Sequence, residues 1–555
     1  AHDPNDYQAG LKHNLEIIEV FDDSSIMGDL VPEYKGMPAI EARKLIVEKL
    51  QELGNLVKIE DYTHNVGKCY RCHNTIEPRI SEQWFVSMKD LAKRAADAVR
   101  NDEVKFVPKR YEKMYFNWLD NIQDWCISRQ LWWGHRIPVY YCDECGHIHA
   151  EKQMPEKCEK CGSSKLHQDE DSLDTWFSSA LWPFSTLGWP NTESEDYKTF
   201  YPTNVLVTGY DIITFWVSRM MTQGLELTDK NPFKDVVVHG IVRDSQGRKM
   251  SKSLGNGVSP IDVSNKFGAD ILRLWALSSD YSMDVNLSDD ILKGISDVYR
   301  KIRNTARYIL GNTSDYNPEE PVNYEDLQEI DKWALTRLNK LVKDCTYNYD
   351  NYNFSNCYHD INQFCVLDMS NFYLDIIKDR LYTSKTNSLA RRAAQTTMYI
   401  ILDSLVKILT PMIPFTAEEI WKSMRHTKNE QLDSVALTDF PKPNEEYDNK
   451  ELSEKWDRIL KLKDVVAKEL ENARAEKIIG HSLNAKVTMY TKGDEYKFLN
   501  DNIELLRTVF IISDLEIIEI DSEFKIKVEQ AAGEKCERCW MYSVTVGEDK
   551  ENPTI

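Results

Sequence analysis

The sequence has no apolar run of the ~18 residues that a membrane-spanning helix needs. Its longest apolar stretch, MYIILDSLVKILTPMIPF, is broken by Asp403, Lys407 and Pro411. No secretory signal peptide is recognisable at the start, AHDPND, which also has no initiator methionine. We therefore expect a cytoplasmic protein with no membrane partner, and a chain that is a fragment or a processed form.

Basic residues are in the minority. The chain has 69 Lys and Arg against 90 Asp and Glu, which gives a net charge of −21. This balance argues against a generally basic coat for nucleic acid, but not against a local basic groove. With 555 residues, of which 42% are hydrophobic and 29% charged, the composition predicts a globular protein of several domains.

Disulfides are not expected, because eight of the twelve cysteines form CxxC pairs in a chain without a secretory signal. Two pairs, Cys142/Cys145 and Cys158/Cys161, have twelve residues between them. Each CxxC turn offers two sulfurs to one point, so the four thiolates predict a structural Zn²⁺ in a tetrahedral site, with reduced free thiols or an iron–sulfur site as the alternatives.

The other two pairs, Cys69/Cys72 and Cys536/Cys539, are half-sites for a metal. A complete site needs a second pair in each case, and none is near in sequence. We expect the partners beyond the two ends of the chain. Binding of one metal by both pairs together, and thiols without metal, are the alternatives.

The order of elements predicts one half of a doubly wound, Rossmann-type fold. Short β-branched segments ending on glycine occur at 204–209 (NVLVTG) and 235–240 (DVVVHG), and the segment between them has helical spacing. Residues 1 to about 62 have the pattern of short strands with one helix. After about residue 290, long amphipathic segments predict an α-helical bundle.

One loop, GRKMSKSLGN at 247–256, places three cations in ten residues and has no apolar face. Taken alone, it would be a solvated surface loop. It follows the strand that ends in HG, however, and its KMSKS at 249–253 is word for word the second signature of the class I aminoacyl-tRNA synthetases. The chain resembles that family, which implies ATP with Mg²⁺, an amino acid and tRNA as ligands.

This resemblance gives the loop a role in amino-acid activation. Lys249 and Lys252 would act on the triphosphate while a carboxylate attacks the α-phosphorus, and Ser251 would complete the phosphate cradle. Gly247 and Gly255 would let the loop move, so that the cations engage as charge develops.

The ATP site implied by the resemblance also includes the ends of the two predicted strands. Gly209 and Asp211 of GYD would hold the ribose, because a strand-end glycine admits the nucleotide and a carboxylate pairs with hydroxyls. A helix N-cap is the alternative for Asp211. His239 and Gly240 would line the same site.

Two further sites follow from the resemblance. Trp176, Ile212 and Trp216 would form a pocket for a branched aliphatic side chain, although residues with this spacing are often simply core. Asp3 and Asp6 of HDPND would end an editing site that hydrolyses mischarged tRNA, with helix capping as the alternative. Editing is needed because an apolar pocket rejects an isostere only weakly, a limit well known for the valine enzyme against threonine.

The two parts of the chain resemble different branches of the family. Residues 1 to about 257 are similar to valyl-tRNA synthetases, as in DSLDTWFSSALWPFSTLGWP, and residues ~258 to 555 to isoleucyl-tRNA synthetases, as in MSNFYLDIIKDRLY. A joined, a recombined and a divergent sequence are all open. The pocket lies in the first part, so we expect activation of valine and its transfer to tRNA(Val), with isoleucine as the alternative.

The family's first signature, HxGH, does not occur in the sequence, so we expect this chain to be inactive alone. A zinc-containing fragment that binds tRNA without catalysis is a further alternative. We expect a monomer that contacts tRNA through basic residues at the start of the helical bundle, with a solvated helix face as the alternative: Lys293, Arg300, Lys301, Arg303 and Arg307.

The fold class implied is multidomain α/β with a Rossmann-type catalytic half. The expected order is the C-terminal part of a β-rich editing domain (1–62), a connective segment with a half zinc site (63–115), the second half of the catalytic domain (116–245) with a zinc ribbon at 141–166, the KMSKS loop and stem-contact region (246–290), a helical anticodon-binding domain (291–440), a small α/β domain (441–530) and a partial zinc finger (531–555).

Overall fold

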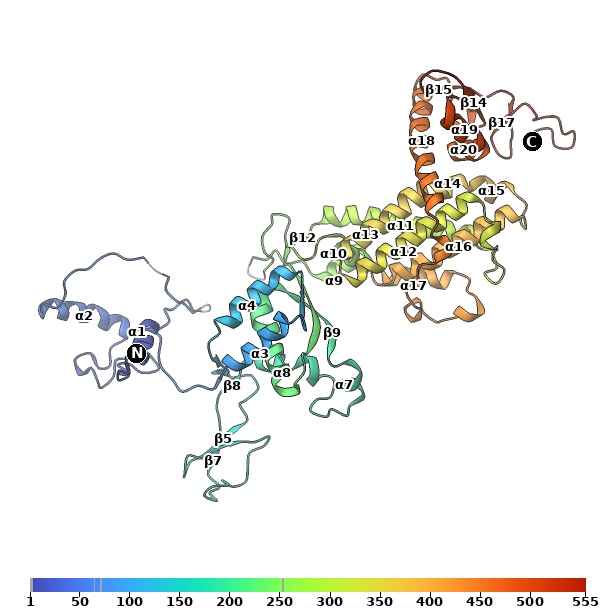
Figure 1. Cartoon of the computed structure of the whole chain (residues 1–555). Helices are drawn as coiled ribbons and strands as arrows, with labels where there is room; N and C mark the ends of the chain where they lie inside the picture. The colour runs from blue at the N-terminus through green and yellow to red at the C-terminus, as the bar shows by residue number, and fades with distance from the viewer. Residues whose placement is uncertain (1–2, 64, 70–71, 252–253) are drawn as a thin grey trace. The chain divides into compact units, whose positions relative to one another are not determined.

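The computed structural model describes residues 3–63, 65–69, 72–251 and 254–555, and Figure 1 labels their main helices and strands. The chain divides into two compact units. The first unit comprises Ala1–Glu103, Tyr115–Thr203 and Thr214–Pro232. The second comprises Val104–Met114, Asn204–Ile213 and Phe233–Ile555. Among the described helices, none combines the length and apolar character required to cross a membrane.

The first unit contains helices and several short antiparallel strand pairs. Helix α3 packs on α8, and small residues such as Ala95 and Ala96 line the buried face of α3 and allow this close approach. The main elements are α1 (Pro4–His13), α2 (Ala39–Glu52), β1 (Phe85–Val86), α3 (Lys89–Arg100), α4 (Glu112–Asp120), β3 (Trp125–Cys126), β4 (Ser128–Arg129), β5 (Val139–Cys142), β6 (Ile148–Ala150), β7 (Leu166–Gln168), β8 (Ser172–Leu173), α5 (Thr175–Ser179), α6 (Trp182–Ser185), α7 (Glu195–Phe200) and α8 (Ser218–Thr228).

The expected β-rich start of the chain is wrong for the described residues between 3 and 62. Two helices form there, and strand pairing is limited to isolated bridges such as Phe21↔Met27. The first helix, α1, begins where Asp3 accepts hydrogen bonds from two backbone N–H groups and Pro4 occupies the first turn. A capping carboxylate and a proline at this position both favour a helix over a strand.

The second unit begins with a three-stranded sheet in the order β2 (Lys105–Val107), β10 (Phe233–His239), β9 (Thr203–Gly209). Strand β10 is central and runs parallel to β2, with Val236 opposite Phe106. The consecutive residues Val236, Val237 and Val238 are all buried, so both faces of this strand are covered.

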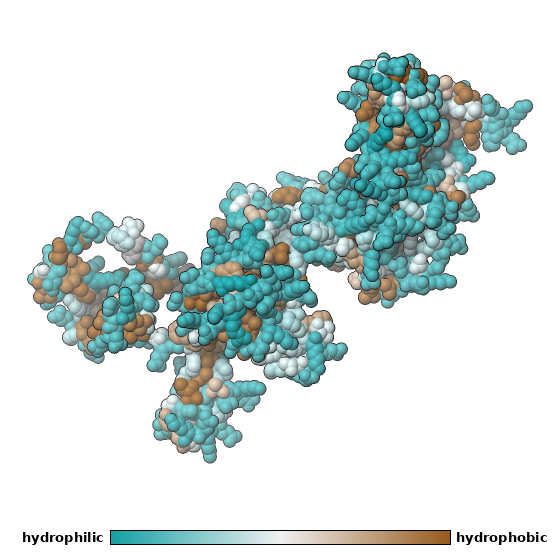
Figure 2. All heavy atoms as spheres, in the orientation of Figure 1, coloured by the Kyte–Doolittle hydropathy of each residue, from teal (hydrophilic) through white to brown (hydrophobic). Residues whose placement is uncertain are grey.

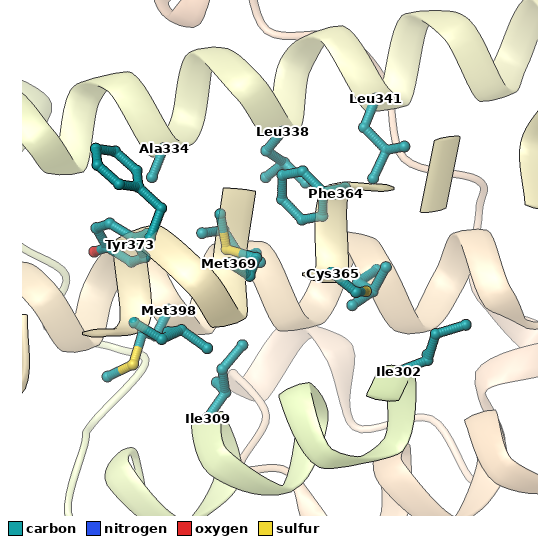
Figure 3. Close-up of a cluster of buried hydrophobic side chains, with 14 of the residues drawn as sticks. Ile302, Ile309, Ala334, Leu338, Leu341, Phe364, Cys365, Met369, Tyr373 and Met398 are labelled. Carbon is teal, nitrogen blue, oxygen red and sulfur yellow. The ribbon is translucent and has the colours of Figure 1, made fainter. Parts of the chain in front are cut away.

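A helical bundle follows, after α9 (Pro260–Phe267) and α10 (Ala269–Ser278). Figure 3 shows side chains from several of its helices meeting in one core, including Leu338, Phe364 and Met398. The surface over the bundle is largely hydrophilic in Figure 2. The bundle comprises α11 (Asp289–Asn312), α12 (Glu329–Asp350), α13 (Phe354–Gln363), the π-helix η6 (Phe364–Tyr373), α14 (Leu374–Ile376), α15 (Lys378–Thr383), α16 (Leu389–Leu409) and α17 (Pro414–Ser423).

A long helix, α18 (Lys450–Ala475), links the bundle to a small α/β region. Trp456 of α18 lies 5.4 Å, between ring centroids, from Trp333 of α12, so this helix shares the bundle core. The sheet beyond it has the order β14-β13-β15. Its elements are β13 (Ala485–Thr491), α19 (Gly493–Asp501), α20 (Ile503–Phe510), β14 (Asp514–Glu519) and β15 (Lys525–Gln530), followed by the hairpin β16 (Glu534–Lys535) and β17 (Tyr542–Ser543).

Candidate active site

The ends of β9 and β10 bring three of the predicted ATP-site residues together. A Cβ placed on Gly209 would lie 2.8 Å from Asp211 Oδ1 and 3.4 Å from His239 Cε1. Any other residue at 209 would therefore crowd the Asp211 carboxylate. Asp211 lies in the short 3-10 helix η3 (Tyr210–Ile212), whose N-cap is Gly209. The alternative of an N-cap role for Asp211 is wrong.

His239 is exposed at this edge. Its Nδ1 lies 2.7 Å from the carbonyl oxygen of Gly240. A carbonyl oxygen only accepts, so Nδ1 carries the proton and Nε2 is left as the acceptor of the neutral ring. The side chain is exposed, and a ligand hydroxyl could donate to it.

Gly240 has a structural reason to be glycine. A Cβ at this position would lie 2.1 Å from Met283 O, and the Gly240 N–H donates to Tyr281 O over 2.8 Å. The strand end is thus held against the 281–284 segment. This close backbone approach requires glycine, whatever Gly240 contributes to a ligand site.

The KMSKS loop emerges from a tight hairpin. Arg243 and Lys249 form an antiparallel bridge, and the N–H of Gly247 donates to Asp244 O over 2.9 Å. Gly247 and Gly255 have φ values of +75° and +62°, so both are turn residues in a left-handed conformation. Glycine adopts this conformation without steric cost.

Two residues that the sequence analysis missed, Asp244 and Asn256, join the two sides of this loop. The Asn256 side-chain amide donates to Asp244 Oδ2 over 2.9 Å, and its Oδ1 accepts from the Ser251 N–H, also over 2.9 Å. Asp244 Oδ1 accepts from the N–H groups of Gln246 and Arg248. The Asn256 amide, and then the Arg248 N–H, lower the pKa of Asp244 well below its usual range.

The loop reaches the strand ends through its first lysine. Lys249 Nζ lies 3.6 Å from Asp211 Oδ2, and both side chains are accessible to solvent. A predicted phosphate-binding cation and a predicted ribose-binding carboxylate are therefore neighbours. Lys252, the other predicted cation, lies outside the described residues. Ser251 is described, and its Oγ accepts from the Leu254 N–H over 3.3 Å.

Asp284 fixes the strand that carries this hairpin. Its Oδ1 accepts from the Ile241 N–H over 2.8 Å, and its Oδ2 accepts from Arg243 Nε over 2.6 Å. The Ile241 N–H and the Arg243 guanidinium lower the pKa of Asp284. The pattern RDSQG contains a turn signal that points to Asp244, whereas Asp284 has no local signal in the sequence.

The three predicted aliphatic-pocket residues are divided between the two compact units. In the first unit, Trp176 stacks on Phe215 with ring centroids 5.6 Å apart, and Trp216 Nε1 donates to Ser179 O over 3.0 Å. Ile212 belongs to η3 of the second unit and is half-buried. Phe215, which is exposed, is the neighbour that orients Trp176.

The zinc ribbon forms on the antiparallel sheet β6-β5-β7 of the first unit. Cys142 Sγ and Cys161 Sγ are 3.5 Å apart, Cys145 Sγ and Cys158 Sγ are 3.6 Å apart, and all four sulfurs lie within 4.8 Å of one another. Zinc–sulfur bonds of 2.3 Å in a tetrahedron separate the sulfurs by about 3.8 Å. The four thiols therefore fit a structural Zn²⁺.

The backbone of the ribbon favours thiolates at two of these positions. Burial raises the pKa of Cys142, but hydrogen bonds from the N–H groups of Cys145 and Glu144 outweigh it and lower the pKa to about 7. Burial likewise raises the pKa of Cys158, and the N–H of Cys161 contributes to lowering it to about 7. Thiolates are the form that binds zinc.

The two half-sites differ in their surroundings. Cys69 and Cys72 lie in a loop, where the Cys69 N–H donates to Asn74 O over 2.9 Å. Cys536 is buried beside the β16–β17 hairpin, and hydrogen bonding from the Cys539 N–H lowers its pKa. Within the described residues, neither pair belongs to a group of three or more possible metal ligands. Their metal binding stays a prediction.

Several of the remaining predicted site residues have protein partners. Asp3 Oδ1 accepts from the N–H groups of Asn5 and Asp6, which is the capping interaction, and its editing role stays a prediction together with that of Asp6. The five basic residues of α11 are exposed. Lys293 pairs with Asp290, Arg300 with Asp297 and Arg303 with Glu419, whereas Lys301 and Arg307 form no salt bridge among the described residues.

Comparison with known families gives three matches. Residues 8–288 match the tRNA synthetases class I (I, L, M and V), residues 331–489 the anticodon-binding domain of tRNA ligase, and residues 533–555 the zinc finger found in FPG and IleRS. These matches confirm the predicted fold class: a Rossmann-like catalytic part, a helical anticodon-binding part and a terminal zinc-finger segment.

Individual relatives carry two different names. The chain is 42% identical to an isoleucine–tRNA ligase of Caldanaerobacter subterraneus, covering 100% of the chain and 63% of that protein. It is 45% identical to a valine–tRNA ligase of Thermotoga maritima, covering 93% of the chain and 58% of that protein. The chain thus spans about three fifths of the length of these relatives.

Among solved structures, a methionyl-tRNA synthetase of Mycobacterium tuberculosis bound by methionyl-adenylate is similar in fold. The match has a TM-score of 0.50 at 18% identity and covers 68% of this chain and 71% of that one. At this identity the likeness concerns the fold alone. Because the sequence relatives include both isoleucine–tRNA and valine–tRNA ligases, they do not determine which of the two amino acids this chain would bind.

Proposed function

Since the chain belongs to the class I tRNA synthetases of the I, L, M and V group, we propose that its site serves ATP-dependent activation of valine and transfer to tRNA(Val). One observation carries this proposal. Lys249 of the KMSKS loop lies 3.6 Å from Asp211, which shares the end of the sheet with Gly209 and His239. A cationic loop and a carboxylate therefore meet at the strand ends, where open α/β sheets bind ligands.

The chemistry needs both kinds of group. When the amino-acid carboxylate attacks the α-phosphorus of ATP, an acyl–phosphate bond forms and the bond to pyrophosphate breaks. Negative charge then grows on the phosphate oxygens, so ammonium groups that are already in position stabilise the transition state more than the ground state. We assign this role to Lys249, and Mg²⁺ would accompany the triphosphate as part of the substrate.

ATP would also replace the contact between Lys249 and Asp211. Both side chains are substantially exposed, so the existing ion pair is weak and its loss costs little. Asp211 could then accept hydrogen bonds from ribose hydroxyls, while Lys249 turns to the phosphates. The hairpin that carries Lys249 is fixed by the Arg243–Lys249 bridge, which restricts the positions that the Lys249 ammonium group can reach.

Valine is the proposed amino acid because the predicted pocket residues lie in the part of the chain that resembles valyl-tRNA synthetases. Isoleucine is the second candidate, and two observations favour it. The terminal zinc-finger segment matches one found in IleRS, and an isoleucine–tRNA ligase aligns with 100% of the chain. We also propose hydrolytic editing of mischarged tRNA through Asp3 and Asp6, for which the Asp3 side chain would have to release its capping contact with α1.

Thermal unfolding with adenylate analogues tests the proposal on the chain itself. The ligands are valyl- and isoleucyl-sulfamoyl adenosine, with AMP as a reference. We expect the valyl analogue to give the largest increase in melting temperature. Asp211→Asn should reduce the increase with every ligand, whereas Asp229→Asn, at an exposed surface ion pair, should not. A larger increase with the isoleucyl analogue would reassign the amino acid.

Absence of protection by all three ligands, with tRNA binding retained, would instead support a zinc-containing tRNA-binding module without catalysis. That result would contradict the proposed site at the strand ends. Protection by AMP but by neither aminoacyl analogue would support the proposed nucleotide site and contradict the proposed amino-acid pocket.

A further inference from the structure

The zinc ribbon carries a second group of ligand atoms beside the four cysteines. His147, His149 and Glu159 each place one possible ligand atom within 4.8 Å of the other two. His147 Nε2 is 2.8 Å from Glu159 Oε1, and the rings of His147 and His149 are 4.6 Å apart at 90°. All three belong to the first unit, so the grouping is internal to one compact part of the chain.

His149 provides an independent indication of a ligand. It is only 5% exposed on strand β6, opposite Tyr140, and its side chain lies beside the thiol of Cys158, whose pKa it helps to lower; its Nε2 has no partner of regular hydrogen-bond geometry among the described residues. An unpaired polar atom that is removed from water costs roughly 1–3 kcal/mol. A metal ion bound to an imidazole nitrogen removes this cost and uses the commonest metal-binding side chain.

We propose that His147, His149 and Glu159 bind a second divalent cation of the zinc class, next to the four-thiolate site. Two imidazoles and one carboxylate form a ligand set that zinc accepts, with a fourth position left for water. Imidazole also suits Co²⁺ and Ni²⁺, and it disfavours Mg²⁺ and Ca²⁺, which take oxygen ligands.

The geometry requires only a small adjustment. Metal–ligand bonds of 2.0–2.2 Å in a tetrahedron separate the ligand atoms by about 3.3 Å. His147 and Glu159 are already closer than this, and the Glu159 side chain is 73% exposed and free to turn. The buried His149 on β6 would fix the position of the cation, and the two more exposed residues would complete its coordination shell.

Charge favours a second cation at this place. Four thiolates around one Zn²⁺ leave a net charge of −2, and Glu159 directly follows the ligand Cys158. A divalent ion a few ångströms away is attracted by this charge, and the attraction is larger near a protein surface than in bulk water. The thiolate site would therefore support the second site and precede it in affinity.

The same ribbon contains a comparison pair. His167 Nδ1 lies 2.6 Å from Asp143 Oδ1, so this pair is as close as His147 and Glu159. It belongs to no group of three possible ligands among the described residues. A histidine–carboxylate contact alone is thus not the basis of the proposal, which depends on the third, buried imidazole.

Metal analysis of the whole chain tests the proposal. The protein is freed of metal, titrated with Zn²⁺, dialysed and measured by mass spectrometry for bound zinc. The test variant is His147→Ala/Glu159→Gln, which keeps the buried His149 and its packing. The control is His167→Ala/Glu144→Gln, which removes one histidine and one carboxylate from the same ribbon; Glu144 otherwise pairs with Lys165.

We expect the test variant to hold one equivalent of zinc less than both the wild type and the control. Cobalt substitution separates the sites, because the sulfur-to-cobalt absorption of the thiolate site should be equal in all three proteins. Equal zinc content in test and control variants would overturn the proposal and leave His147 and Glu159 as an ordinary ion pair. Loss of the sulfur-to-cobalt band in the test variant would also overturn it, since the residues would then support the cysteine site only.

Discussion

At the scale of single residues, Asp244 and Asn256 explain how a polar loop can be held beside the ends of strands β9 and β10. The Asp244 carboxylate accepts four hydrogen bonds, two of them from Arg248 and one from Asn256. The lowered pKa of Asp244 means that folding favours its ionised form. Its contribution is fully present above its ordinary pKa, about 3.9, and is lost as the pH falls toward the folded value.

Replacing Asn256 should loosen this loop without unfolding the protein. Asn256→Ala removes the acceptor of the Ser251 N–H and one donor to Asp244. A typical hydrogen bond contributes about 1 kcal/mol and two are lost, so amide hydrogen exchange of the 244–256 segment should become roughly thirtyfold faster. Gln246→Ala is the control, because only the Gln246 backbone takes part in the network. Equal exchange in both variants would contradict the anchoring role of Asn256.

Two glycines should respond in opposite directions to alanine. Gly240→Ala would place a methyl group 2.1 Å from Met283 O, and the backbone must move, so we expect a loss of about 1–3 kcal/mol. Gly294 lies inside α11 with nothing within 4 Å of a Cβ, so Gly294→Ala should stabilise by about 0.5–1 kcal/mol. Urea midpoints measure both. If Gly240→Ala leaves the urea midpoint unchanged, the 281–284 segment moves aside at little cost in stability.

At the scale of elements, the accuracy of the sequence predictions depends on how local the signal is. The strands predicted at 204–209 and 235–240 correspond to β9 and β10 within two residues, because a β-branched run and a closing glycine define them locally. Strand β2 was not predicted, since its three residues carry no period and it pairs with β10 more than a hundred residues later.

The candidate site follows the same rule. Gly209, Asp211, His239 and Lys249 were predicted from short motifs, and the structure places them near one another. The partners that hold them come from elsewhere. Asp284 contacts Arg243 across some forty residues, and such a contact leaves no pattern in either segment alone. The buried His149 was not among the predicted ligands, because burial is not visible in a sequence.

The helical bundle should depend strongly on one buried ion pair. Asp331 is 0% exposed and accepts from Arg380 Nη1 and Nη2 over 2.8 and 2.6 Å and from the Tyr373 hydroxyl over 2.8 Å. Arg380→Met leaves this carboxylate buried without a counter-charge, which should cost about 3–5 kcal/mol.

Urea unfolding followed by circular dichroism measures this loss, with Arg300→Met as the control at the exposed pair with Asp297. The control should change stability by less than about 1 kcal/mol. Asp331→Asn/Arg380→Met should recover part of the loss, because no unpaired charge remains. If Arg380→Met and Arg300→Met behave alike, the buried pair contributes little.

At the scale of the whole molecule, a net charge of −21 opposes the approach of a polyanion, so the proposed binding of tRNA requires a local surface of positive charge. The helix α11 provides one, with exposed Arg300, Lys301, Arg303 and Arg307. Two of these four are partly neutralised by Asp297 and Glu419. Lys301 and Arg307, which have no salt bridge among the described residues, should therefore contribute most to phosphate contacts.

Lys301→Glu/Arg307→Glu should weaken tRNA binding and reduce its dependence on salt. The slope of log K against log salt concentration is negative, and each lost phosphate contact reduces its magnitude by about 0.7–0.9. Loss of two contacts should therefore reduce the magnitude by about 1.5. The control, Lys442→Glu/Lys450→Glu, makes the same change in net charge at exposed positions outside α11. Filter binding from 50 to 300 mM salt measures both slopes. If the control lowers the slope as much as the α11 variant, tRNA responds to net charge rather than to this helix, and the exposed face of α11 is merely solvated.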